Sequence, residues 1–191
     1  YGEDPRQGYT EGNTFYHPEL KFRFSFPAGW KLTNAPTQVT MQPSDGKALI
    51  LFTLSGQKSL KAAADSTLIQ YGLTLQRAEQ RTVNGMPAII MLSKQEGQDN
   101  STGQVISNTI LSYVIEYGSM YYVFHSVSTT ADFPAYVNAM EASMNTFARL
   151  TDASKINVKP MRVHLKPMPR TGTLASGLSY YGVSQDKMAE L

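Results

Sequence analysis

The three histidines, His17, His125 and His164, are the residues of this chain best suited to metal binding or acid–base chemistry. A zinc peptidase of the HExxH type needs two histidines four residues apart on one helix, with a glutamate beside the first, to hold Zn²⁺ and activate water. No two of these histidines have that spacing, and the chain has no cysteine that could supply a thiolate ligand. We therefore expect this chain by itself to contain no catalytic residue, no metal ligand and no cofactor.

Ser112, Glu116 and His125 are the types of residue that make a hydrolytic triad. They fall on two segments that a two-residue turn at Gly118 and Ser119 would pair as a hairpin, and the register puts all three on the same face. Glu116 then lies about two pair positions from His125, and an exposed sheet face offers no oxyanion hole. A structural role is favoured, and an enzyme with its site on this wetter face is kept as a third hypothesis.

Tyrosine is abundant, with eleven residues, and four of them gather along the same hairpin: Tyr113, Tyr117, Tyr121 and Tyr122. Tyrosine is favoured at recognition surfaces, so these side chains are candidates for a partner or ligand surface. Cross-strand packing of aromatic residues explains the cluster equally well. Both interpretations stay open at this stage.

The elements that position these residues begin with a strand between residues 15 and 30, in which Leu20, Phe22, Phe24 and Phe26 alternate with polar residues. This period of two is typical of a strand with one buried face. Further strands are predicted over residues 37–42, 47–54, 74–83, 86–94, 105–117 and 120–128, with a polar loop at 95–103. Asn84-Gly85 is a strong signal for a type I′ hairpin turn.

Two helices are predicted to cover this sheet. One begins after Ser59 and spans residues 60–71, and the other runs from Asp132 to Leu150 with an apolar stripe that includes Met140 and Met144. The fold class is therefore α+β, an antiparallel sheet of about six strands covered by two helices.

The composition and the segment boundaries narrow the classes of function. A net charge of +2 disfavours nucleic-acid binding, and no apolar run approaches the roughly 20 residues of a membrane helix.

Residues 1–13 read as a linker from an upstream segment, 14–150 as the main domain, 151–160 as a second linker and 161–191 as a small tail. The chain is expected to be a fragment of a longer protein.

Two resemblances follow from particular motifs. The opening FSFPAGW, the hairpins and the closing MNTFARL resemble PsbP-type domains, which implies an antiparallel sheet flanked by helices. The run YGEDPRQGYTEGNTFYHPELKFRFSFPAGWKLTN resembles the region after the catalytic domain in exported zinc metallopeptidases, of the CAAX-prenyl-protease-like family 48. The matching residues are Gly8, Gly12, Phe15, His17, Pro18, Leu20, Phe22, Phe24, Pro27, Gly29, Trp30 and Asn34.

The tail RTGTLASGLSYYGVSQDKMAEL is similar to a lysin motif, a strand followed by two short helices. The resemblance implies glycan contacts, with peptidoglycan as the ligand, from Thr173, Leu174, Gly182 and Val183. The tail departs from the motif because no Asp precedes Thr173 and the chain stops before the expected Asn. A glycan-binding tail and an incomplete remnant of the motif are both left open.

These resemblances imply a non-catalytic accessory region of an exported zinc metalloprotease, periplasmic or associated with the cell envelope. Its partner would be the upstream protease domain, which would carry the HExxH motif and the zinc, or else a substrate or another envelope protein. The alternative is a freestanding PsbP-like protein that binds a ligand on its sheet face or hairpin rim.

Overall fold

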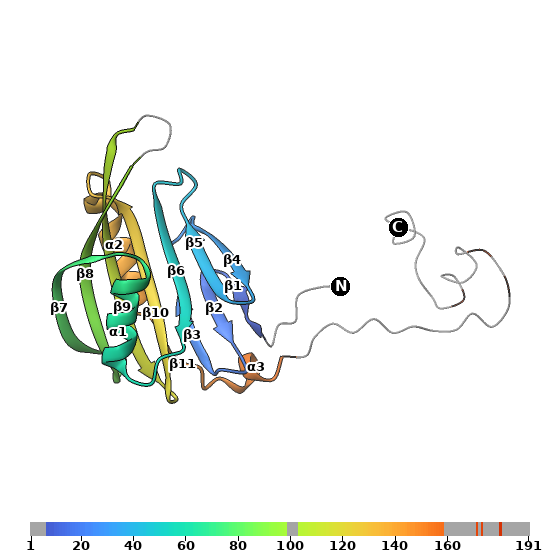
Figure 1. Cartoon of the computed structure of the whole chain (residues 1–191). Helices are drawn as coiled ribbons and strands as arrows, with labels where there is room; N and C mark the ends of the chain where they lie inside the picture. Colours follow the sequence, from blue (N-terminus) through green and yellow to red (C-terminus); the bar gives the residue numbers. More distant parts are fainter. Residues whose placement is uncertain (1–6, 99–102, 159–170, 172, 174–179, 181–191) are drawn as a thin grey trace. The chain divides into compact units, whose positions relative to one another are not determined.

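A computed structural model describes residues 7–98 and 103–158, together with residues 171, 173 and 180 (Figure 1). The chain divides into two compact units, residues 1–160 and 161–191. The strand and the two helices predicted for the tail lie outside the described residues, as do His164, Leu174, Gly182 and Val183. Thr173 is described, and the helices and strands labelled in Figure 1 all belong to the first unit.

Seven antiparallel strands form the larger sheet, in the order β4-β5-β6-β10-β9-β8-β7 (Figure 1). Their bounds are β4 (Lys31–Ala35), β5 (Gln38–Gln42), β6 (Ala48–Ser55), β7 (Thr74–Val83), β8 (Met86–Gln98), β9 (Val105–Tyr117) and β10 (Met120–Thr129). The loop predicted at residues 95–103 is shorter than expected, since β8 continues to Gln98 and pairs there with Val105.

Four short strands form a second sheet, in the order β1-β2-β3-β11. They are β1 (Tyr9–Glu11), β2 (Thr14–His17), β3 (Phe22–Ser25) and β11 (Ala148–Arg149). The segment predicted as one strand folds back on itself, because Lys21 adopts a positive φ of 55° in the turn between β2 and β3. Strand β1 lies within the predicted linker 1–13, so residues 9–11 belong to the sheet.

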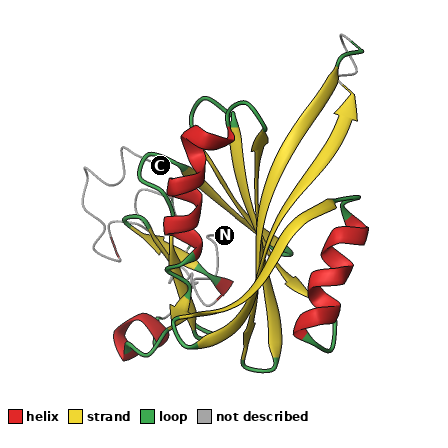
Figure 2. Cartoon of the chain, turned by 90° about the vertical axis from the view of Figure 1, so that its left-hand side faces the viewer, coloured by secondary structure: helices red, strands yellow, loops and turns green. Residues whose placement is uncertain are grey.

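The two faces of the larger sheet are covered by different elements (Figures 1 and 2). Helix α2 (Phe133–Met144) and the small sheet pack on one face, and α1 (Leu60–Gln70) packs on the other. A one-turn helix, α3 (Ala153–Ile156), follows β11. Among the described residues, none of these helices is long and apolar enough to cross a membrane.

Both main helices begin where the sequence predicts. Ser59 caps α1, because its hydroxyl oxygen accepts the Ala62 N–H at 3.1 Å, and Pro134 lies in the first turn of α2. Helix α2 ends at Met144 instead of Leu150. The predicted apolar stripe still reaches the core, since Phe147 and Leu150 are buried in the extended chain that leads into and past β11.

Aromatic side chains join the two sheets and α2 into one core. The Phe22 ring of β3 lies 5.3 Å from Phe52 of β6, 5.1 Å from Tyr122 of β10 and 5.3 Å from Phe147, measured between ring centroids. Met140 and Met144 of α2 are fully buried in the same cluster, as their helical spacing predicts. The segment around Phe22 therefore contributes the central contacts between layers.

The predicted hairpin registers are confirmed. Val83 pairs with Met86 across Asn84-Gly85, and Tyr117 pairs with Met120 across Gly118-Ser119. Both turns have positive φ at the two central residues, as a type I′ turn requires. Strands β9 and β10 therefore place five side chains on one face, where they form part of the main core: Leu111, Tyr113, Ile115, Tyr122 and Phe124.

The predicted fold class is right, but the predicted number of about six strands is too low, since eleven strands form two sheets in the described part of the chain. The strands that it misses are β1, β2, β4 and β11. They are two to five residues long, so they carry little periodic signal.

Candidate binding groove

A groove of about 530 Å³ opens where the β2–β3 hairpin approaches the β4–β5 turn. Its lining comes from both sheets and from the segment before β1. The residues are Gln7, Phe15, His17, Glu19, Leu20, Phe22, Asn34, Ala35, Pro36, Thr37, Gln38, Val39, Phe52, Thr53, Leu54 and Tyr122. It is larger than a cavity of about 210 Å³ that lies between β7, β8 and α2.

Four buried aromatic rings, those of Phe15, Phe22, Phe52 and Tyr122, contribute to the lining of the groove. The rings of Phe52 and Tyr122 stack at 5.8 Å with an interplanar angle of 11°. Burial raises the pKa of Tyr122 to about 12, and the nearby Tyr117 contributes in the same direction. This part of the groove therefore suits an apolar or aromatic group and disfavours a charge.

His17 lies at the end of β2 and lines the groove beside this aromatic part. Its Nδ1 accepts the Leu20 N–H at 3.2 Å, and its ring lies 5.1 Å from that of Phe22. Burial lowers the pKa of His17, and the charge of Glu19 opposes that shift. The ring is therefore neutral near pH 7, and because Nδ1 accepts, the proton is on Nε2. This hydrogen bond fixes the chain that enters β3.

The segment before β1 forms one wall of the groove because Gly8 comes very close to Phe15. A Cβ built on Gly8 would lie 2.3 Å from Cζ of Phe15, and the φ of Gly8 is +116°. The Asn34 side-chain amide of β4 donates to the carbonyl oxygens of Gln7 and Gly8, each at 3.4 Å. Glycine at position 8 thus lets this wall pack directly on an aromatic ring.

The rest of the lining is mostly polar and carries a single acidic side chain, Glu19, which is exposed. The amides of Gln7, Asn34 and Gln38 line the groove, while Leu54 adds an apolar side chain that is 45% exposed. Apolar surface with a few hydrogen-bonding groups is the usual make-up of a binding site for a small molecule or a peptide side chain. Within the ranges that the structure describes, no group of three His, Asp or Glu residues could hold a metal ion.

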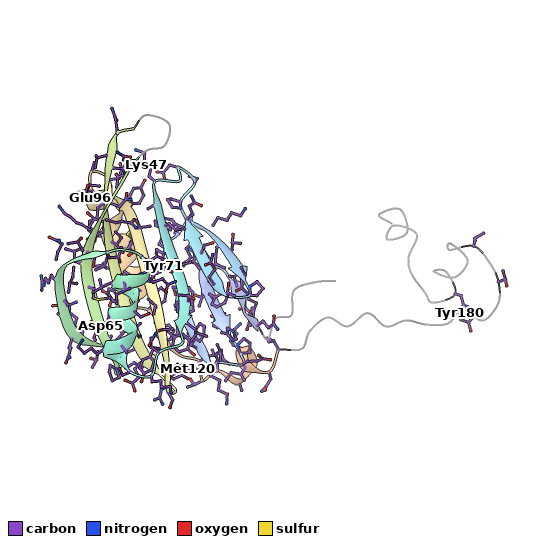
Figure 3. All side chains as sticks on the ribbon, viewed as in Figure 1. Lys47, Asp65, Tyr71, Glu96, Met120 and Tyr180 are labelled. Carbon is purple, nitrogen blue, oxygen red and sulfur yellow. The ribbon has the colours of Figure 1, made fainter. Side chains whose placement is uncertain are left out.

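The triad candidates Ser112, Glu116 and His125 lie on the face of the large sheet that α1 covers, and the structure brings only two of them together. Ser112 Oγ lies 2.9 Å from His125 Nδ1, but Glu116 pairs with Tyr121 further along the hairpin. Ser112 is fully buried and His125 is 6% exposed, so no substrate reaches them. Tyr71, labelled in Figure 3, is the C-cap residue of α1. Its ring packs on the imidazole of His125, with 4.7 Å between the ring centroids.

The expectation that this face is wet was wrong where α1 lies over it. Ala63 and Ala64 of α1 let the helix come close to the sheet, where they pack with Met91, Val114 and Val123. Burial lowers the pKa of His125 to about 4, so the ring is neutral at pH 7. The Ser112–His125 pair is therefore structural.

The four tyrosines do not form one surface. Tyr113 and Tyr122 are fully buried in the main core, so neither belongs to an exposed surface of the hairpin. Tyr117 is half-buried and donates from its hydroxyl to the Lys21 carbonyl at 2.8 Å. Tyr121 lies on the α1 face and donates to the Lys58 carbonyl at 3.3 Å. The packing interpretation accounts for all four, and only Tyr122 lines the groove.

Sequence reasoning missed the groove, although one signal pointed to it. The positions that carry the metallopeptidase resemblance include five that line the groove: Phe15, His17, Leu20, Phe22 and Asn34. Gly8 belongs to the same set and makes the contact with Phe15. A motif explained at first as the start of a strand thus also supplies much of a binding site.

Comparisons with known proteins identify the fold. No protein-family model matches the sequence, and no curated protein is similar to it in sequence. Among solved structures, cyanobacterial PsbP (CyanoP) from Synechocystis is similar over 73% of this chain and 94% of its own, with a TM-score of 0.56 and 13% identity. The Ran-binding protein Mog1p from Saccharomyces cerevisiae is similar over 77% of this chain and 99% of its own, with a TM-score of 0.50 and 13% identity.

A protein from Bacteroides thetaiotaomicron is also similar, over 73% of this chain, with a TM-score of 0.51 and 14% identity. The match spans 49% of that protein, so this chain corresponds to about half of its length. Identities this low show the arrangement of the chain alone. With its antiparallel sheets and few helices, this chain has a PsbP-like fold.

Proposed function

We propose that this chain is a non-catalytic binding domain whose groove receives an apolar segment of a protein partner. The observation that carries the proposal is the groove itself, which combines buried aromatic rings with hydrogen-bonding side chains. Its volume of about 530 Å³ lies within the usual range for ligand sites, roughly 300–1,000 Å³. The exposed amide of Gln38 can orient a peptide backbone, while the NH2 group of Asn34 is already bound to the carbonyl oxygens of Gln7 and Gly8.

The partner that we favour is the protease domain of an exported zinc metallopeptidase, of which this chain would be an accessory region outside the cytoplasm. This choice rests on the resemblance of residues 1–34 to that family and on the five shared positions that line the groove. In this arrangement the zinc and the HExxH motif belong to the protease domain. The accessory region docks to that domain or presents a substrate to it.

The second candidate is a freestanding binding protein, and one comparison favours it. Mog1p, which has a similar fold, is a Ran-binding protein, so this architecture can serve a domain that binds another protein. The gene around this segment separates the two candidates. An HExxH-encoding segment upstream supports the accessory role, and an export signal directly before Tyr1 supports the freestanding protein.

The test of the groove is a pair of matched substitutions. Leu54→Asp puts a charge on the groove, and Ile69→Asp puts the same charge on the outer face of α1, where the side chain is 81% exposed. Peptides selected from a display library against the whole chain are titrated by fluorescence anisotropy, and the protease domain by calorimetry. We expect Leu54→Asp to weaken binding by about tenfold or more and Ile69→Asp to leave it unchanged.

Equal affinities for both variants would show that the partner binds elsewhere and would refute the groove as the site. The non-catalytic assignment has a separate test, in which the chain is incubated with Zn²⁺ and an unfolded peptide. We expect no turnover and no stoichiometric zinc, and finding either would overturn it.

A further inference from the structure

We propose that two copies of this chain associate through the outer edge of strand β7, joining their large sheets into one continuous sheet. Strand β7 (Thr74–Val83) is the last strand of the seven-stranded sheet (Figure 1). In the part of the chain that the structure describes, no strand pairs with its outer side. All its residues except Glu79 and Val83 are exposed. This inference is independent of the groove.

The position of Pro87 shows which backbone groups of β7 face outward. Pro87 of β8 lies opposite Thr82 and has no N–H, so this pair is one of the non-hydrogen-bonded pairs of the ladder. Such pairs alternate with hydrogen-bonded ones. Ala78, Gln80 and Thr82 therefore direct their N–H and C=O groups away from β8, toward a strand that would add at this edge.

These three residues restrict how a second copy can pair. An antiparallel copy of β7 can pair so that a two-fold axis passes between Gln80 of one copy and Gln80 of the other. On each side of this axis, Ala78 of one copy then lies opposite Thr82 of the other. The resulting three pairs exchange about six backbone hydrogen bonds. The same axis places Glu79 directly opposite the partner's Arg81, and Arg81 opposite the partner's Glu79.

Charge complementarity and the β-bulge of β7 together select this register. Arg77, Glu79 and Arg81 share the face of β7 that points toward α2, and within one chain Glu79 binds Arg77 at 3.0 Å and Arg81 at 2.5 Å. In the register with Gln80 on the two-fold axis, called the centred register below, two opposite-charge pairs form between the copies. Both are non-hydrogen-bonded pairs, in which the two side chains lie closer together. A slip that centres the axis on Glu79 or on Arg81 sets like charges opposite each other, which is destabilising. An axis on Ala78 would also set Arg77 opposite Glu79, but it needs Gln76 to pair with Gln80, and the β-bulge between Leu75 and Arg77 interrupts the ladder there.

The other sheet edges are less suited to a second copy. Strands β1 and β11 have three and two residues, and β4 has five. The Asn34 side chain of β4 already binds the carbonyl groups of Gln7 and Gly8. Natural edges that avoid pairing commonly carry proline, charged side chains or a β-bulge. Strand β7 has no proline, its bulge lies between Leu75 and Arg77, outside the Ala78–Thr82 segment, and its charges alternate in sign. That alternation makes its edge self-complementary.

Two charge reversals test the proposal on the full chain, with the dimer constant measured by sedimentation equilibrium. Glu79→Arg puts arginine opposite arginine, and Arg81→Glu puts glutamate opposite glutamate. We expect each variant alone to dimerise about tenfold or more weakly than the natural chain. An equimolar mixture restores opposite charges at both positions, so a one-to-one heterodimer should form with an affinity near that of the natural chain.

The matched control is Arg77→Glu, which also breaks an ion pair with Glu79 inside the chain. In the centred register position 77 faces Val83 of the second copy, so this variant should dimerise like the natural chain. Circular dichroism checks that every variant is folded. A natural chain that stays monomeric, reversals that leave a dimer intact, or a mixture that fails to pair would each overturn the proposal.

Discussion

His125 is a buried imidazole whose protonation opposes folding. Its pKa falls from 6.5 to about 4 because burial penalises the charged ring. The stability that depends on the neutral ring is fully present above pH 6.5 and is lost as the pH falls toward 4, where the unfolded chain binds the proton more tightly. We expect the free energy of unfolding to drop by about 3 kcal/mol between pH 7 and pH 4 from this residue alone.

Urea denaturation over this pH range measures the effect, and His125→Asn should remove that part of the pH dependence. Burial also lowers the pKa of His17, which acts in the same direction, so His17→Asn is measured in parallel. Equal pH profiles for the natural chain and His125→Asn would show that His125 is not the group responsible.

Gly8 is the second residue whose environment leads to a sharp expectation. Gly8→Ala must displace the Phe15 ring and hold alanine at a φ of +116°, so it should lower the free energy of unfolding by about 2–4 kcal/mol. Gly12→Ala is the control, because Gly12 has a φ of +55° and no atom within 4 Å of the new Cβ. Gly12→Ala should lower the free energy of unfolding by about 1 kcal/mol, measured by thermal or urea unfolding. Equal losses would argue against the close contact with Phe15.

At the scale of elements, Asn84 ties the β7–β8 hairpin to the end of α2. Its side-chain amide donates to the carbonyl oxygens of Asn145 at 2.9 Å and Phe147 at 2.8 Å. Asn84→Asp tolerates the left-handed turn but replaces the donor with a carboxylate, so we expect a loss of about 1–3 kcal/mol. Hydrogen exchange should also show faster opening of β7 and β8 than of β9 and β10.

The other type I′ turn supplies the control for this substitution. Ser119 has a φ of 63°, which asparagine adopts more readily than serine. Ser119→Asn should therefore keep or slightly raise the melting temperature. If both variants lower it equally, the effect at Asn84 comes from turn geometry and not from the contact with α2.

At the scale of the whole molecule, the aromatic core predicts that both sheets unfold together. Phe22 belongs to the small sheet and contacts rings from β6, β10 and the segment after α2. Phe22→Ala should cost about 3–5 kcal/mol, whereas Ile69→Ala on the outer face of α1 should change stability by less than about 0.5 kcal/mol. The unfolding transition followed by Trp30 fluorescence should have the same midpoint as the transition followed by far-ultraviolet circular dichroism. Separate midpoints would mean that the small sheet unfolds by itself.

Much of the large sheet follows from local patterns. Alternation on both sides of Asn84-Gly85 and Gly118-Ser119 determines which side chains share a face, because one residue of slip would invert every one of them. The start of α1 follows from the Ser59 cap, and Pro134 suits the first turn of α2, where the backbone N–H that proline lacks would have no helical partner. Both effects act within one turn of chain. These features involve residues close in sequence, so the sequence alone determined them.

Contacts between distant segments could not be read in the same way. Ala148 pairs with Arg23, and α1 covers Ser112 and His125, yet no local period encodes either contact. The groove likewise arises only where the β2–β3 hairpin meets the β4–β5 turn. The sequence by itself determined the class of fold, the hairpins and the core residues. Tertiary structure decided which face of the large sheet is dry and where a ligand can enter. The reason is that burial depends on packing between residues that are far apart in the sequence.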